Sequence, residues 1–343
     1  MFNKFVTFLL FVLCAIITST YAASPEQPNS VSTDPNSLQP LINKANKGDP
    51  NAQFVLGTMY YDLKDYNEAI KWYTKAAEQG VTKAYVNLGL MYEMGNGVSR
   101  DYKETFRWWN KAAEQGNANA QYGLGHMYAN GKGVEQDYKE AAKWFTKAAE
   151  QGNSAAQSCL GYMYDLGKGV TQDYKEAIKW YTEAAKQGNP DAQLNLGNMY
   201  EMGKGVLQDY KEAIKWYIKA AEQGIAGAQD NLGAMYYKGE GTARDYKEAA
   251  RWFTKAANQG DAWTQSMLAT MYYEGKGVIE DYVEAYKWAL IAGMNGQDVD
   301  EIKQALSAQM TPAQIAEAQR LAKEFVAKGE KETATDINSL GLK

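Results

Sequence analysis

The sequence predicts an all-α fold, a right-handed solenoid (superhelix) of stacked antiparallel helical hairpins. A glycine after Gln recurs every 36 residues, at Gly80, Gly116, Gly152, Gly188, Gly224 and Gly260. Seven of the nine tryptophans keep the same step, from Trp72 to Trp288. Apolar residues between these marks fall at helical spacing. A fixed period of this length is typical of repeat proteins, in which each unit packs only on its neighbours.

Residues 1–22 have the layout of a secretory signal peptide. Lys4 precedes an apolar run from Phe5 to Ile17, and small residues follow up to Ala22. The run is shorter than the roughly 20 residues that span a bilayer, so we expect cleavage after Ala22 rather than a membrane anchor. The mature chain would not span a membrane. We expect it to be periplasmic or secreted, with an extracellular or host-delivered destination left open.

Two segments precede the first complete repeat. Residues 23–37 are polar and contain prolines, which predicts a flexible linker. Residues 38–47 resemble half a repeat and predict an N-terminal capping helix. Such a helix would cover the apolar face that the first hairpin would otherwise expose.

Seven helical hairpins are predicted over residues 48–293, the first of them four residues short. In the third, Asp137 is placed to cap the second helix, and Glu140 follows three residues later as in a capping box. Gly152 ends that helix, because glycine takes the left-handed conformation at little cost. The apolar face of the helix comprises Tyr138, Ala141, Phe145, Ala148 and Ala149.

The period is lost after residue 293, and residues 294–328 predict C-terminal capping helices. One helix is expected near 298–308 and another over 311–325. The second begins with Thr311 as cap, Pro312 at its first position and Gln314 closing a capping box. The polar residues 329–343 predict a flexible tail.

The stretch AQYGLGHMYANGKGVEQDYKEAAKWFTKAAEQGN, at residues 120–153, resembles the Sel-one-like repeat (SLR) family, relatives of the tetratricopeptide repeats. The resemblance covers about 245 residues. It implies that the first helix of each unit lines a concave surface. It also implies a bacterial adaptor in an envelope complex, a signalling regulator or a host-interaction factor.

The Gly131-Lys132-Gly133 loop raises the alternative of a phosphate site. A P-loop requires four residues between its glycines, then Lys and Ser or Thr, with a strand before the loop. Here five residues separate Gly125 from Gly131, and other copies replace the lysine by Asn96 or Glu240. We therefore interpret the loop as a turn between two helices, with Lys132 in solvent.

Other chemistry is also disfavoured. His126 is the only histidine, and Cys159 is the only cysteine outside the signal peptide, which predicts a buried, inert thiol. The net charge of −5 argues against nucleic acid as a partner. The cysteine pairs of SLR proteins proposed to act on β-lactams are lacking. We expect no catalytic residues, no metal and no cofactor, and hence no enzyme.

The candidate site consists of positions that vary between repeats on the inward side of the first helices. Repeats one to five carry more apolar and aromatic residues there than six and seven. The alternatives are packing between hairpins or drift without a role. The predicted partner-binding residues of the concave groove are Phe54, Thr58, Tyr61, Val86, Leu90, Met94, Tyr122, His126, Asn130, Ser158, Tyr162, Leu166, Leu194, Asn198, Met202 and Trp263.

These observations predict a monomeric, exported, non-enzymatic scaffold that holds a partner protein, through a peptide or helix, in its groove. The alternative from another class is a carbohydrate- or peptidoglycan-binding module or an envelope enzyme. The periodic placement of the aromatics argues against that alternative, because it assigns most of them to the core. Self-association is a third reading.

Overall fold

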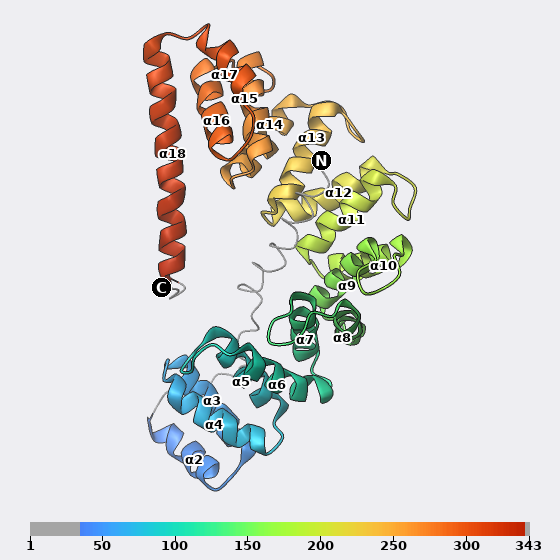
Figure 1. The fold of residues 1–343 in the computed structure, drawn as a ribbon, viewed down its shortest axis with the longest axis vertical. Helices are drawn as coiled ribbons and strands as arrows, with labels where there is room; N and C mark the ends of the chain where they lie inside the picture. Colours follow the sequence, from blue (N-terminus) through green and yellow to red (C-terminus); the bar gives the residue numbers. More distant parts are fainter. Residues whose placement is uncertain (1–34, 340–343) are drawn as a thin grey trace. The chain divides into compact units, whose positions relative to one another are not determined.

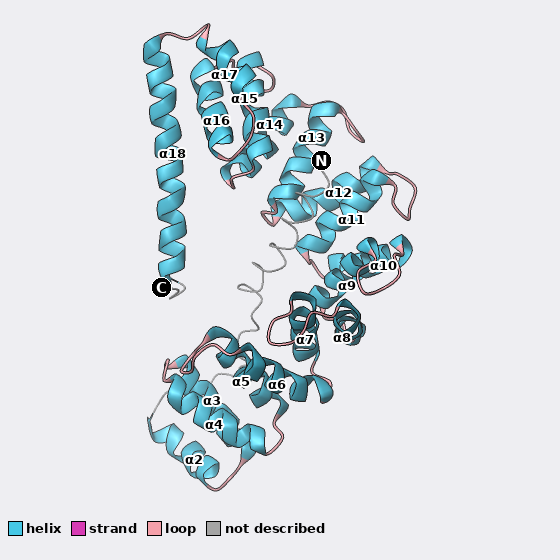
Figure 2. Ribbon diagram, viewed as in Figure 1, coloured by secondary structure: helices cyan, strands magenta, loops and turns pink. Residues whose placement is uncertain are grey.

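The structure, a computed structural model, describes residues 35–339, and every regular element in that range is a helix (Figures 1 and 2). The predicted signal peptide and most of the linker lie outside it. The described part of the chain divides into two compact units, one up to Trp180 and the other from Tyr181 onward. The boundary falls inside α10 (Tyr174–Lys186). The predicted all-α class of stacked hairpins is confirmed.

The first unit is a stack of hairpins that begins with a single helix. After this helix, successive helices from α3 to α9 pack on one another in chain order, so that first and second helices of the hairpins alternate. The helices are α2 (Pro35–Asn46), α3 (Pro50–Asp62), α4 (Tyr66–Glu78), α5 (Thr82–Met94), α6 (Tyr102–Glu114), α7 (Ala118–Asn130), α8 (Tyr138–Glu150) and α9 (Ser154–Leu166).

The second unit repeats the same packing and closes with two helices of a different kind. Helix α18 packs along α16, and α17 contacts both α15 and α16. The helices are α11 (Pro190–Met202), α12 (Tyr210–Glu222), α13 (Ala226–Lys238), α14 (Tyr246–Asn258), α15 (Ala262–Glu274), α16 (Tyr282–Met294), α17 (Asp300–Ser307) and α18 (Pro312–Ser339).

The aspartate caps of the second helices are confirmed, but the glutamate half of the box is not. Asp137 Oδ1 accepts from the backbone N–H of Lys139 at 2.8 Å and of Glu140 at 3.1 Å. Glu140 pairs instead with Lys143. The reason is that the Asp137 N–H already donates to the Tyr128 carbonyl at 3.0 Å, so it is not available to the Glu140 carboxylate.

In five of the hairpins a glycine of the first helix faces an aromatic ring of the second helix. A Cβ added at Gly125 would lie 2.6 Å from the Phe145 ring, and one at Gly57 would lie 2.5 Å from the Tyr73 ring. The glycine therefore lets the two helices approach until backbone meets ring. In the last repeat alanine fills both register positions, at residues 269 and 289.

A buried glutamine links neighbouring repeats, which the sequence reading did not anticipate. Gln121 Nε2 donates to the Ala113 carbonyl of the preceding repeat at 3.1 Å. Its Oε1 accepts from Gln151 at the end of its own hairpin at 2.7 Å. The donor bond to the preceding repeat recurs at Gln157, Gln193, Gln229 and Gln265, and Gln53 donates in the same way to Ala45 of α2. In the second repeat Tyr85 stands at this position and stacks on Trp108, with ring centroids 5.8 Å apart.

The Gly-Lys-Gly loop also joins repeats. Gly133 has φ of 71°, and a Cβ there would lie 2.3 Å from the Tyr102 carbonyl oxygen of the preceding repeat. Lys132 Nζ lies 5.6 Å from the centroid of the Tyr102 ring. The lysine is half-buried, so its prediction as a solvated residue is corrected: the close seating of the loop brings it over the ring.

The terminal helices are longer than expected. Helix α2 begins at Pro35 rather than residue 38, and α18 continues through residues 329–339 of the predicted tail. No proline lies in that stretch to end the helix. The predicted capping box at Thr311 is confirmed, since its Oγ1 accepts from the Gln314 N–H at 3.3 Å and its own N–H donates to Gln314 Oε1 at 2.9 Å.

Within residues 35–339, no helix combines the length and the apolar character that a membrane span requires.

Candidate partner-binding surface

The predicted groove residues lie on the first helices, and their exposure separates them into two groups. We call the side of the hairpins that these helices form the first-helix face. Six of the predicted residues are buried, namely Phe54, Thr58, Val86, Leu90, His126 and Ser158. Buried side chains offer almost no area to a partner, so these six belong to the packing alternative.

The buried group packs against the second helices. The Phe54 and Tyr73 rings lie 5.7 Å apart, and the Tyr73 hydroxyl donates to Thr58 Oγ1 at 3.2 Å. Burial is the largest cause of the rise in the pKa of Tyr73, to about 12. A partner could reach these side chains only if the hairpin opened.

In the first unit, the exposed candidates are the last residues of two first helices. Met94 ends α5 and is 40% exposed, and Leu166 ends α9 and is 36% exposed. The repeat between them carries Asn130, which donates from Nδ2 to the His126 carbonyl at 2.8 Å and so turns back on its own helix. The structure therefore places two apolar side chains at equivalent positions two repeats apart.

Half-buried tyrosines complete the first-helix face of the first unit. The Tyr122 ring lies 5.9 Å from Phe145 and 6.5 Å from His126. Tyr61 packs edge-on against Tyr66 at 5.3 Å, and Tyr162 is also half-buried. These rings therefore pack against neighbouring side chains while part of their area stays exposed to solvent.

In the second unit, Met202 is 60% exposed and Trp263 is 36% exposed. The Trp263 ring packs edge-on against Phe253 at 5.7 Å, which fixes its position. Leu194 and Asn198 are half-buried on α11. This face carries more polar groups than that of the first unit.

One polar network of the second unit involves Asn198 directly. The Tyr217 hydroxyl of α12 lies 2.7 Å from Asn198 Oδ1 and 2.5 Å from Glu201 Oε2. Asn231 of α13 donates from Nδ2 to the same Asn198 oxygen at 3.0 Å. Burial, followed by the charge of Glu201, raises the pKa of Tyr217, so the phenol stays protonated. The network ties three helices together.

Asp230 lies beside this network and was not among the predicted residues. Its Oδ1 is buried and has no hydrogen-bond partner among the described residues. Burial, with the charges of Asp261 and Glu201, raises its pKa to about 7, and Lys238 opposes the rise. A signal was present in the sequence, because Asp230 is the only carboxylate among the seven residues at its register position.

The tryptophans of the second helices do not present open rings for a sugar to stack on. Lysine ammonium groups lie over Trp72, Trp144 and Trp216, 4.0–4.2 Å from the ring centroids. Such cation–π contacts stabilise the pairs, and the lysines compete with any ligand for these three rings. Trp108, Trp252 and Trp288 are buried, as predicted for core residues, whereas Trp72, Trp144, Trp180 and Trp216 are only half-buried.

No group of three or more His, Cys, Asp or Glu side chains in residues 35–339 is arranged to hold a metal. Cys159 is half-buried beside the core of the α7–α9 region, rather than fully buried as predicted.

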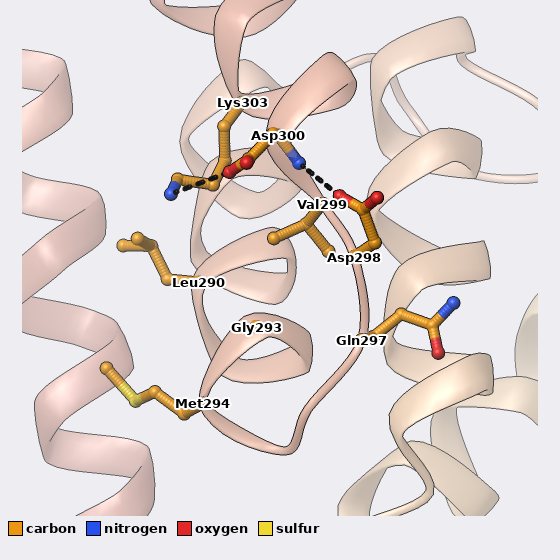
Figure 3. A pocket seen from close by; sticks show the side chains of 8 residues that line it. All are labelled: Leu290, Gly293, Met294, Gln297, Asp298, Val299, Asp300 and Lys303. Atoms are coloured by element: carbon orange, nitrogen blue, oxygen red, sulfur yellow. Dashed lines mark hydrogen bonds and ion pairs between the residues drawn. The ribbon is translucent and has the colours of Figure 1, made fainter.

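One pocket of about 400 Å³ lies where α16 ends and α17 begins (Figure 3). The lining includes Asp300, whose carboxylate lies 3.8 Å from Lys303 Nζ and whose N–H donates to Asp298. None of the predicted site residues lines it.

Comparison with known proteins defines the class. The model of the Sel1 repeat matches seven times, at residues 50–81, 82–117, 118–153, 154–189, 190–225, 226–261 and 264–297. The chain belongs to the Sel1 repeat family, and the predicted resemblance and the repeat-solenoid fold are confirmed. Proteins of this family are generally protein–protein interaction scaffolds rather than enzymes.

Three solved structures are similar to the chain. A Sel1 repeat protein from Oxalobacter formigenes is 38% identical, with 69% of this chain and 98% of that chain covered and a TM-score of 0.63. A protective antigen present in uropathogenic Escherichia coli strains is 30% identical, with 96% and 86% covered and a TM-score of 0.43. Cysteine-rich protein B of Helicobacter pylori is 31% identical, with 37% and 92% covered and a TM-score of 0.31. Comparison with curated proteins gave no match.

Proposed function

We propose that the chain is an exported adaptor that binds an apolar or amphipathic segment of a partner protein on the first-helix face. The observation that carries the proposal is the pair of exposed apolar side chains, Met94 and Leu166, at equivalent positions of two repeats. Flexible Met and Leu side chains suit an adaptable apolar surface. Side chains at helix-compatible intervals on a partner would supply the matching anchors.

The binding step is tested by a paired variant of the first unit. Met94→Gln with Leu166→Gln removes apolar area at two exposed positions, so partner recovery by affinity capture and mass spectrometry should fall by roughly tenfold or more. The melting temperature should change little, because neither side chain is buried.

Leu207→Gln is the matched control, since Leu207 is 90% exposed but lies in an insert loop outside the first-helix face. It should leave partner recovery unchanged. Equal recovery with the paired variant and the wild type would show that this face does not bind.

Export is the second part of the proposal and rests on the layout of residues 1–22. Expression in a Gram-negative host, followed by cell fractionation and N-terminal sequencing, should give a protein outside the cytoplasm that begins at Ala23. Recovery of the uncleaved chain in the cytoplasm would contradict this part without affecting the binding proposal.

A further inference from the structure

We propose that Asp230 makes the junction between α11 and α13 pH-sensitive: the junction is tight when the carboxyl group is protonated and loosened when it is ionised. Asp230 and both helices of this junction lie in the second unit. It goes beyond the proposed binding function and does not depend on it.

The geometry places an acidic side chain where its charge is poorly compensated. Asp230 Oδ1 is buried and accepts no hydrogen bond from the described residues. An ionised oxygen in this position loses water without gaining a donor, which is far less favourable than burying a neutral carboxyl group. The same helix, α13, is joined to α11 through the Asn231–Asn198 bond of 3.0 Å and through Leu194, which lies close to Gly227.

The charged groups around Asp230 increase this penalty. Glu201 faces it from α11, and Asp261, the N-cap of α15, faces it from the following repeat. Only Lys238, on α13 itself, acts in the opposite direction. The Tyr217 hydroxyl from α12 is held by Asn198 and Glu201 and donates no bond to the aspartate. Two carboxylates against one lysine therefore favour the protonated form.

The direction of the pH dependence follows from the raised pKa. The ordinary pKa of the aspartate is 3.8, and in the folded chain it is about 7. The folded state keeps a proton that the unfolded state releases, so the stabilising contribution is present in full below pH 3.8 and declines as the pH rises to about 7. Above that value the carboxylate is charged in both states and the contribution stays lost.

The test is hydrogen exchange measured by mass spectrometry on the full chain at pH 5.5 and pH 8, corrected for intrinsic exchange rates. Protection of peptides from α11 and α13 should fall by roughly tenfold or more at the higher pH, relative to peptides from α5 in the first unit. In Asp230→Asn, which resembles the protonated carboxyl group, that relative fall should disappear.

Two further variants secure the interpretation. Asp230→Ser introduces the residue that repeats four and seven carry at this position, at Ser158 and Ser266, so the fold accommodates it. It should lose the pH dependence as Asp230→Asn does. Glu274→Gln removes an exposed carboxylate of the same unit, paired with Lys276, and should keep the dependence. An unchanged pH response in both Asp230 variants, or no relative fall in the wild type, would overturn the proposal.

Discussion

At the scale of single residues, the first turn of the repeat array carries backbone strain that its copies avoid. Lys64 has φ of 62°, the one positive value at a non-glycine residue in the described chain. The other first helices end on a glycine in the left-handed conformation, such as Gly131 with φ of 65°. The short first repeat lacks that glycine, and lysine takes its place in the turn.

Lys64→Gly should therefore raise the free energy of unfolding by about 0.5–1 kcal/mol, because the left-handed conformation strains a residue with a Cβ. Chemical denaturation monitored by circular dichroism measures the change. Lys71→Gly, inside α4, should instead lower stability by about 1 kcal/mol. A loss of stability in both variants would mean that the strain at Lys64 is compensated locally.

Single residues also show which parts of the candidate site could be predicted from the sequence. Variation between repeats selected Met94, Leu166, Met202 and Trp263 as candidates for partner binding, and all four are exposed. Variation alone could not distinguish these residues from the buried candidates, because the exposure of a first-helix residue depends on which side chain of the second helix packs against it. Phe54 meets Tyr73 in this way.

At the scale of elements, the buried glutamine determines how one hairpin docks on another. It is polar, nearly inaccessible and bonded on both sides, as at Gln121. A buried amide with both functions satisfied favours one register of the two hairpins over others, because any shift leaves it unpaired.

Gln121→Leu should lower the free energy of unfolding by about 1–3 kcal/mol, since it removes both bonds and leaves Gln151 without its buried acceptor. Thermal denaturation gives the measurement. Gln304→Leu, at an exposed position of α17, should change stability by less than about 0.5 kcal/mol. Similar losses in the two variants would remove the special role of the buried amide.

The element scale also shows where sequence patterns were sufficient. The aspartate caps and the Thr311 box depend on neighbours within one turn, and both are found as predicted. The missing half of the Glu140 box has a cause outside the helix: the Asp137 N–H, from which Glu140 would have to accept, donates instead to the carbonyl of Tyr128. Local spacing could not reveal that competition.

At the scale of the whole molecule, the period of 36 residues determined the fold class, because every copy encodes the same two helices and six of the seven share the same turn. Properties that belong to one repeat alone could not be predicted from the period. Burial and the charges of Asp261 and Glu201 raise the pKa of Asp230, against the opposing charge of Lys238. Such a property arises only when neighbouring repeats are stacked.

The glutamine bonds have a consequence for how the chain can change in length. Each bond reaches only to the adjoining hairpin, and each hairpin ends with the same acceptor. Excision of residues 118–153 would bring Gln157 to the Ala113 carbonyl in place of the Ala149 carbonyl that it now meets. The glutamine bond between the two hairpins would therefore be kept at the new junction. As far as this bond is concerned, the array can gain or lose whole modules of 36 residues, for example through unequal recombination between copies.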